Sequence, residues 1–323
     1  MQKFLSAALL LFFLTGCASS RLRSRGATVP LRVQLNRQHS VNFAGYYQAE
    51  EQGFYARHGL RVSLLPGGTR GETIFDPAEI LLSGQSEFAV LSFAQYQRIA
   101  ADERQPLVVL ATFQISPLVF ISFQEQGIER IQDMYGKRVA IPSPDWQNVV
   151  NRVLENVGMS PEDITQVSLD TPEMDDFYRQ RVDVWPGYLT DEGVQVLLDG
   201  YRVNTIFASN YGWNTYEGLL VTTQPYASAH PENITALVDA TLEGWHYTFA
   251  HPRETASLLA ARYPEHSRLY YELGLEYLRP LVDTGEVPLG WIDYTRWRTL
   301  LNLSDTNFQG YDMRFVETAH LQE

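Results

Sequence analysis

Short apolar runs alternate with longer amphipathic stretches along this chain. Strands separated by helices of this length are typical of βαβ units, in which neighbouring strands run parallel and helices cover the sheet. The rhythm starts at residue 31 and restarts near residue 118, and beyond Pro225 only helical stretches follow. We therefore expect an α/β protein with mainly parallel sheets and a helical C-terminal segment. The predicted strands are 31–35, 61–65, 87–91, 107–112, 118–123, 137–141, 166–169, 182–185, 202–207 and 218–223.

The predicted helices have recognisable start and stop signals. Asp76 is a good N-cap and Pro77 suits the first helical position, so a helix is expected to begin there. Gly53 is expected to close the helix before it. The other predicted helices are 42–54, 93–102, 146–156, 232–250, 253–263, 268–281 and 292–303.

Two α/β halves followed by helices predict two lobes joined by segments that cross between them. We expect the crossings near residues 113–117 and 210–217. Lobe one would then comprise residues 31–113 and 217–323, and lobe two residues 114–216. Ligands of α/β lobes lie beyond the carboxyl ends of the strands, so a cleft between the lobes is the expected binding site.

The N-terminus predicts export and lipid anchoring. Lys3 precedes an apolar run over residues 4–14, which is shorter than the roughly 18 residues that a membrane-spanning helix needs. Leu-Thr-Gly-Cys at 14–17 resembles the bacterial lipobox. The resemblance implies a signal peptide over 1–16, acylation of Cys17 and a lipidated tether over 17–30. We expect a protein anchored at the extracytoplasmic face of the cell membrane.

The cysteine count and the charge exclude several classes of protein. Cys17 is the only cysteine, so a disulfide framework, a cysteine-based metal site and a cysteine nucleophile are all excluded. The net charge of −13 is repelled by phosphates, and we therefore expect no nucleic-acid partner. Nucleophile-elbow, dinucleotide-binding and His-Glu-x-x-His motifs are absent from the sequence, and its seven histidines are scattered. No catalytic or metal site is predicted.

Several sequence words match a known family in order and spacing. Residues 42–55 read NFAGYYQAEEQGFY and lead into HGLRV at 58–62. LLSG at 81–84 precedes EFAV at 87–90, and VDVWPGYLTDE occupies 182–192. Together with GKRV at 136–139 and Tyr-Gly at 211–212, this series resembles the substrate-binding proteins related to SsuA and the thiamine-pyrimidine binders.

The resemblance implies a two-lobed periplasmic-binding-protein fold of type II that serves an ABC importer. Members of this family often bind aromatic vitamins or their precursors. The resemblance implies an ABC permease as partner, a monomer and no cofactor. Riboflavin is the favoured ligand, and a thiamine-precursor pyrimidine of the formylaminopyrimidine or hydroxymethylpyrimidine type is the alternative. A third reading, a sensory ligand-binding module, is less favoured because no transmembrane segment is predicted after Leu303.

One branch of the family synthesises the thiamine pyrimidine and carries a cysteine-rich stretch. That stretch is absent here, which disfavours an enzyme of pyrimidine synthesis.

Candidate ligand-binding residues lie at predicted strand ends. A flat heterocycle requires aromatic faces for stacking and a few fixed polar groups at its edge. Glu192 follows Tyr188 by four residues, so a carboxylate there can accept N–H bonds from a pyrimidine or a flavin imide. Phe43 and Tyr46 also suit ordinary helix packing, and Arg37 is set aside as solvated. The candidates are Asn36, Phe43, Tyr46, Ser92, Gln114, Trp146, Trp185, Tyr188, Glu192, Tyr211 and Trp213.

Overall fold

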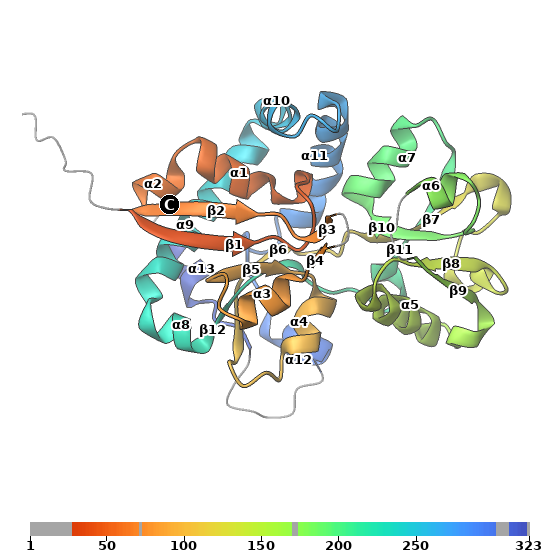
Figure 1. The fold of residues 1–323 in the computed structure, drawn as a ribbon, viewed down its shortest axis with the longest axis horizontal. Helices are drawn as coiled ribbons and strands as arrows, with labels where there is room; N and C mark the ends of the chain where they lie inside the picture. The colour runs from red at the N-terminus through yellow and green to blue at the C-terminus, as the bar shows by residue number, and fades with distance from the viewer. Residues whose placement is uncertain (1–27, 71–72, 170–173, 302–309, 322–323) are drawn as a thin grey trace, which may run out of the picture.

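Two groups of strands, each covered by helices, lie side by side in the computed structural model of the chain (Figure 1). The structure describes residues 28–70, 73–169, 174–301 and 310–321. The expected signal peptide, Cys17 and most of the expected tether lie outside these residues. Within the described parts of the chain, none of the helices is both long and apolar enough to cross a membrane.

The larger group, lobe one, is built on a five-stranded sheet in the order β2-β1-β5-β12-β6. Strand β1 (Val29–Gln34) pairs in parallel with β2 (Leu60–Leu65) and β5 (Phe88–Leu91). Strand β12 (Glu217–Thr223) runs antiparallel to both β5 and β6 (Pro106–Phe113). Strands β2, β1, β5 and β6 therefore all run in the same direction, and β12, which enters on the return from lobe two, runs against them. The expectation of a mainly parallel sheet is confirmed for this lobe.

Close helix packing covers this sheet. Helix α1 (Ala44–Glu51) lies against α9 (Pro231–Ala250). A Cβ atom on Gly244 would lie 2.0 Å from the carbonyl oxygen of Gly45, so the two backbones touch at this point. The other helices of lobe one are α2 (Phe54–Arg57), α3 (Pro77–Leu82), α4 (Phe93–Ile99), α8 (Gln224–Ala229), α10 (Pro252–Arg262), α11 (Arg268–Val282), α12 (Tyr294–Leu301) and α13 (Arg314–His320). A hairpin of β3 (Gly68–Arg70) and β4 (Thr73–Phe75) follows β2.

Lobe two is smaller and mostly antiparallel. Its three-stranded sheet has the order β10-β7-β11, with β7 (Leu118–Phe123) between β10 (Trp185–Tyr188) and β11 (Val203–Phe207). A parallel pair, β8 (Arg138–Ile141) and β9 (Thr165–Ser168), lies beside it. The helices of this lobe are α5 (Pro144–Asn156), α6 (Met174–Tyr178) and α7 (Val194–Leu198).

The prediction of a strand over 182–185 is wrong. The strand begins at Trp185, where the predicted one ends. Val182 and Val184 are buried all the same, and Val184 forms only an isolated bridge with Val139. The apolar run correctly indicates burial, but residues 182–184 form a buried loop rather than a strand.

Two short segments connect the lobes. The chain leaves β6 and reaches β7 through residues 114–117, and it returns through the 3-10 turn Ala208–Tyr211 to β12. One hydrophobic core extends from lobe one into lobe two, and a second, smaller core lies within lobe two alone. We keep residues 31–113 with 217–323, and residues 114–216, as the proposed limits of the lobes.

Candidate functional site

A turn of π-helix carries two acidic side chains of lobe two to the surface of lobe one. This turn, Leu189–Gly193, directly follows β10. Its first residue donates a backbone hydrogen bond to the carbonyl oxygen of Pro117, 2.9 Å away, so the turn is held against the crossing segment. Single π-helical turns are rare and frequently occur at functional sites. This turn presents Asp191 and Glu192 to lobe one.

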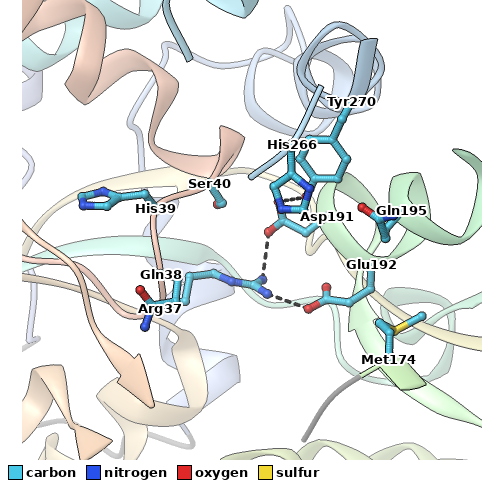
Figure 2. Close-up of a pocket in the computed structure, with 10 residues that line it drawn as sticks. All are labelled: Arg37, Gln38, His39, Ser40, Met174, Asp191, Glu192, Gln195, His266 and Tyr270. Atoms are coloured by element: carbon cyan, nitrogen blue, oxygen red, sulfur yellow. Dashed lines mark hydrogen bonds and ion pairs between the residues drawn. The ribbon is translucent and has the colours of Figure 1, made fainter. Parts of the chain in front are cut away.

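Arg37 of lobe one binds both acidic residues. Its side chain follows β1, and its guanidinium nitrogens lie 3.1 Å from Asp191 Oδ2 and 2.7 Å from Glu192 Oε1 (Figure 2). The guanidinium also lies over the ring of Tyr188, 4.5 Å from its centroid. Burial alone would lower the pKa of Arg37, but the charges of Glu192 and Asp191 outweigh it and raise this pKa. Arg37 is therefore a fixed cation between the lobes.

Asn42 joins the same cluster through both ends of its amide. Its Nδ2 donates to Asp191 Oδ2 at 2.7 Å, and its Oδ1 accepts from the hydroxyl of Thr190 at 2.6 Å. The hydroxyl of Tyr270 on α11 donates to the other oxygen of Asp191 at 3.1 Å. Buried polar groups are costly unless they are paired, and here each donor finds an acceptor across the lobe boundary. We call Arg37, Asn42, Thr190, Asp191, Glu192 and Tyr270 the polar bridge.

The polar bridge borders an open hollow between the lobes. The hollow has a volume of about 210 Å³, and Figure 2 shows Arg37, Asp191 and Glu192 at its centre. Ligand pockets usually span about 300–1,000 Å³, so a tricyclic ligand needs the lobes to move apart before it enters. The other residues that line the hollow are Gln38, His39, Ser40, Met174, Gln195, His266 and Tyr270.

A second ion pair joins the lobes through α4 and α5. Arg98 lies 2.7 Å from Asp76 of its own lobe and 3.5 Å from Asp145 at the start of α5. Burial raises the pKa of Asp145, while Arg98 acts in the opposite direction. The lobes therefore meet through ion pairs at two separate places.

Glu217 lies at the start of β12, where the chain re-enters lobe one, and its side chain has no solvent exposure. Its carboxylate accepts hydrogen bonds from the backbone N–H of Phe93 at 3.0 Å, the hydroxyl of Thr215 at 2.9 Å and the indole N–H of Trp213 at 3.4 Å. Burial raises the pKa of Glu217 to about 7.

Some of the predicted ligand-binding residues lie together at the lobe boundary. Trp146 and Tyr188 meet edge to face, with ring centroids 6.4 Å apart, and both are half-buried. Glu192 accepts a hydrogen bond from the backbone N–H of Tyr188 at 2.7 Å. Asn36 is half-buried beside Arg37, and Tyr211 is half-buried in the return crossing. A ligand-binding role for these residues stays a prediction.

Trp185 requires a correction. As a predicted ligand-binding residue, it should have its indole ring in the cleft between the lobes. Instead it is buried in the separate core of lobe two with Val119, Ile121 and Phe177. The shift of β10 explains the difference, because Trp185 begins the strand and faces the core rather than ending the strand at the cleft.

Other predicted ligand-binding residues have their packing and hydrogen-bond partners in lobe one. Phe43 and Tyr46 are buried, with Tyr46 edge-on against Trp245. The hydroxyl of Ser92 caps α4 by accepting from the backbone N–H of Gln95. The side-chain amide of Gln114 donates to the carbonyl oxygen of Trp291 at 2.9 Å.

Trp213 also lies inside the larger hydrophobic core, which extends across both lobes, and it is edge-on to Phe93. These five side chains face packing or backbone partners rather than an open cleft.

Sequence reasoning missed the polar bridge except for Glu192. At the level of sequence Arg37 is set aside as solvated, although it lies two residues beyond the predicted strand 31–35, where ligand-binding side chains are expected. Asn42 and Asp191 are 149 residues apart, so only the fold brings them together.

Three proteins of known name are similar to this chain in sequence. The chain is 24% identical over 314 residues to the formylaminopyrimidine-binding protein of Halalkalibacterium halodurans, covering 94% of this chain and 93% of the relative. It is 25% identical over 229 residues to the riboflavin-binding protein RibY of Chloroflexus aurantiacus, covering 70% of this chain and 64% of the relative. It is also 24% identical over 314 residues to the 4-amino-5-hydroxymethyl-2-methylpyrimidine phosphate synthase of Legionella pneumophila, covering 93% and 94%.

The fold is similar to that of solved binding proteins. The periplasmic aliphatic sulphonate-binding protein SsuA of Escherichia coli superposes with a TM-score of 0.64 at 19% identity, covering 77% of this chain and 78% of SsuA. The expected periplasmic-binding-protein fold is thereby confirmed. The family model described as "NMT1/THI5 like" matches residues 40–255, which include Asn42, Thr190, Asp191 and Glu192 of the polar bridge. The chain belongs to the NMT1/THI5-like family.

Proposed function

We propose that this protein is the substrate-binding component of an ABC importer and that it captures a small aromatic vitamin or vitamin precursor between its lobes. Riboflavin and a thiamine-precursor pyrimidine are the two candidate ligands, and the names of two relatives support them equally. An ABC permease in the membrane is the proposed partner. We propose no cofactor and a monomeric protein.

The observation that carries this proposal is the Tyr188 ring at the lobe boundary. Trp146 lies edge-on to it, the guanidinium of Arg37 lies over it, and the Glu192 carboxylate is bonded to its backbone. A binding site for a planar heterocycle requires this combination of aromatic surface and fixed polar groups. Both lobes contribute to it, so closing the lobes completes the site.

The polar bridge indicates how the two lobes close, because its residues come from both lobes. The hydrogen bond between Asn42 and Asp191 exists only when the lobes are in contact. A ligand that binds the closed form better shifts the equilibrium toward it. The permease would then receive the closed, loaded form.

A ligand panel tests the proposal. Purified protein lacking residues 1–17 is titrated with riboflavin, with 4-amino-5-hydroxymethyl-2-methylpyrimidine and with an alkanesulfonate, and melting temperature and tryptophan fluorescence are read. Because a ligand that binds only the folded state raises the melting temperature, a ligand at 100 times its Kd adds roughly 2.7 kcal/mol of stability. Binding of either vitamin-type compound supports the proposal. A response to the alkanesulfonate alone, or to none of the compounds, contradicts it.

Membrane anchoring is the second part of the proposal. Lipidation of Cys17 would place the protein at the extracytoplasmic face, although two membrane signals are usually needed for a stable anchor. Arg21, Arg23 and Arg25 lie next to the acylation site and can interact with anionic lipid. The Cys17→Ser variant is expected to move from the membrane fraction to the soluble extracytoplasmic fraction. A variant that stays in the membrane fraction contradicts lipid anchoring.

Enzymatic synthesis of a pyrimidine is the alternative, since one relative is named a synthase. The cysteine-rich stretch of the synthesising branch is absent from this sequence, which favours binding. Formation of a pyrimidine product by the purified protein would support the alternative. Reversible binding of the same compound without turnover supports the importer.

A further inference from the structure

Arg296 contacts both of the segments that cross between the lobes, the outgoing crossing (residues 114–117) and the return crossing (residues 208–216). It lies on α12 of lobe one, and its Nη1 donates to the carbonyl oxygen of Gln114 at 2.8 Å. Its Nη2 donates to the carbonyl oxygen and to the side-chain Oδ1 of Asn214, both at 3.1 Å. One guanidinium therefore holds both crossings against lobe one.

Neighbouring contacts reinforce this attachment. The guanidinium of Arg296 lies 4.0 Å from the centroid of the Tyr216 ring, and the hydroxyl of Tyr216 accepts from the backbone N–H of Asp293 at 2.9 Å. The side-chain amide of Gln114 donates to the carbonyl oxygen of Trp291. Hydrogen bonds from a charged donor are stronger than those between neutral groups, and the planar fork of arginine can hold two acceptors at once. Arg296 is the group that the attachments of the two crossings share.

The outgoing crossing is bound to lobe one at its start and to lobe two at its end. The backbone N–H of Ile115 donates to the carbonyl oxygen of Leu281 in lobe one at 3.0 Å. The carbonyl oxygen of Pro117 accepts from the backbone N–H of Leu189 in lobe two at 2.9 Å. Ser116 lies between these two attachments. A rotation of lobe two must therefore change the backbone dihedral angles at Ser116 or directly beside it.

The return crossing passes from one lobe to the other at Gly212 and Trp213. Its 3-10 turn packs against α5 of lobe two, and a Cβ atom on Gly212 would lie 2.9 Å from Asn156 Cγ on that helix. The indole of Trp213 is edge-on to Phe93 in lobe one, and the next residue is the one that Arg296 holds. Gly212 has a φ of 88°, which glycine adopts without the steric cost of a Cβ atom. The second place where the chain can bend is therefore at these two residues.

We propose that Arg296 is a positioning residue that confines the motion of the lobes to two short hinges, Ser116 and residues 212–213. With Arg296 in place, lobe two turns as one body about these hinges, and the groups of the polar bridge meet in one arrangement. Without it, both crossings bend over more residues, and lobe two samples more orientations. The inference deepens the proposed function, because it assumes that the lobes move to admit a ligand. Arg296 lies beyond residues 40–255, which the family model matches.

A role in the stability of lobe one alone is the competing explanation. If Arg296 only holds α12 in place, its loss lowers the melting temperature and leaves the range of distances between the lobes unchanged. A measurement of that range separates the two explanations. It also requires no ligand, so its result does not depend on the choice of vitamin.

The experiment measures the distance between the lobes by double electron–electron resonance. Cys17 is the only cysteine of the chain, so protein lacking residues 1–17 takes spin labels only at introduced cysteines. The labelled sites are Glu103→Cys in lobe one and Tyr135→Cys in lobe two, and both residues are exposed in the structure.

This labelled protein is compared with the same protein carrying Arg296→Ala, Arg296→Lys or the control Arg314→Ala. The side chain of Arg314 is 82% exposed and pairs with Asp312, two residues away. We expect one narrow distance distribution for the labelled wild type and for Arg314→Ala. Arg296→Ala should broaden the distribution about twofold with unchanged circular dichroism, because hinge residues set the path of domain motion. Arg296→Lys keeps the charge but not the planar fork, and it should broaden the distribution about 1.5-fold.

Several outcomes would overturn the proposal. Equal widths for all four proteins would show that Arg296 does not restrict the lobes, and a distribution that is already broad in the wild type would show that nothing does. Equal broadening in Arg314→Ala would assign the effect to any lost charge of the C-terminal segment. If Arg296→Ala does not fold, a wild-type width for Arg296→Lys contradicts the proposal. Failure of the wild type to bind any compound of the ligand panel would contradict the proposed function and leave the distance measurement valid.

Discussion

The amide nitrogen of Asn42 in lobe one donates a hydrogen bond to Asp191 Oδ2 in lobe two at 2.7 Å. Both side chains are buried, and 149 residues of chain separate them. Such a contact is made or lost as a unit when two lobes close or open. A substitution at Asn42 is therefore expected to destabilise the closed form of the protein.

Asn42→Asp places a second negative charge against Asp191. Loss of the hydrogen bond and repulsion between the charges are expected to destabilise the closed form by about 2–4 kcal/mol. Small-angle X-ray scattering should give a larger radius of gyration than for the wild type. Gln132→Glu, which adds a charge at an exposed site of lobe two, serves as control. Equal radii for all three proteins would show that the contact does not hold the lobes together.

Gly274 on α11 provides a steric test of the same closure. A Cβ atom at this position would lie 3.0 Å from Val41 Cγ1 and 3.1 Å from the carbonyl oxygen of Thr190. Gly274→Val is therefore expected to push the π-helical turn of lobe two away from α11. Ligand affinity should fall at least 10-fold, which corresponds to about 1.4 kcal/mol. Glu276→Val introduces the same residue at an exposed site on the same helix and should bind normally. Normal affinity of both variants would mean that binding does not require this contact.

Trp185 tests the corrected placement of a predicted ligand-binding residue. Trp185→Ala is expected to destabilise the fold by about 3–5 kcal/mol, because it leaves a cavity in the core of lobe two. The affinity of the remaining folded protein for its ligand should match the wild type. Tyr135→Ala, at a side chain that is 70% exposed in the same lobe, should change stability by less than about 0.5 kcal/mol. A stable Trp185→Ala variant that no longer binds the ligand would show that Trp185 contributes to the binding site.

The buried carboxyl of Glu217 is expected to make the stability of the protein depend on pH. Burial raises the pKa of Glu217 to about 7 from an ordinary value of 4.5. The folded protein therefore binds this proton more tightly than the unfolded chain, and the contribution of Glu217 to stability falls as the pH rises from about 4.5 to 7. The shift corresponds to about 3 kcal/mol between the ends of this window.

The measurement is denaturant unfolding of the wild type and Glu217→Gln at pH 5 and pH 8. The stability of the wild type relative to the variant should be lower at pH 8 than at pH 5. A difference that does not change with pH would show that Glu217 titrates near its ordinary pKa in the folded protein.

Local signals predicted much of the fold. Asp76 caps α3, and Pro77 is its first residue, as expected. Strand β7 has the predicted bounds. Gly53 ends α1 in a left-handed conformation with φ of 70°, and it also starts the short helix α2, which a single periodic pattern over 42–54 did not reveal. Hydrogen-bonding and φ preferences of single residues were enough in these places.

Tertiary pairing determined what local signals did not predict. The apolar run 182–185 is buried without joining the three-stranded sheet until Trp185, because only the neighbouring strand decides where a ladder begins. The β3–β4 hairpin is absent from the predicted elements, because local sequence does not specify which short segments pair with each other. Residues of the polar bridge lie on segments whose proximity depends on the arrangement of the two lobes.

A crystal structure of the protein with a bound aminopyrimidine or riboflavin would show whether the two lobes close on the ligand. We expect a planar ligand between the lobes, against Tyr188, with the Asn42–Asp191 hydrogen bond intact. A ligand bound elsewhere on the surface, or one bound with the lobes apart and this hydrogen bond absent, would contradict it.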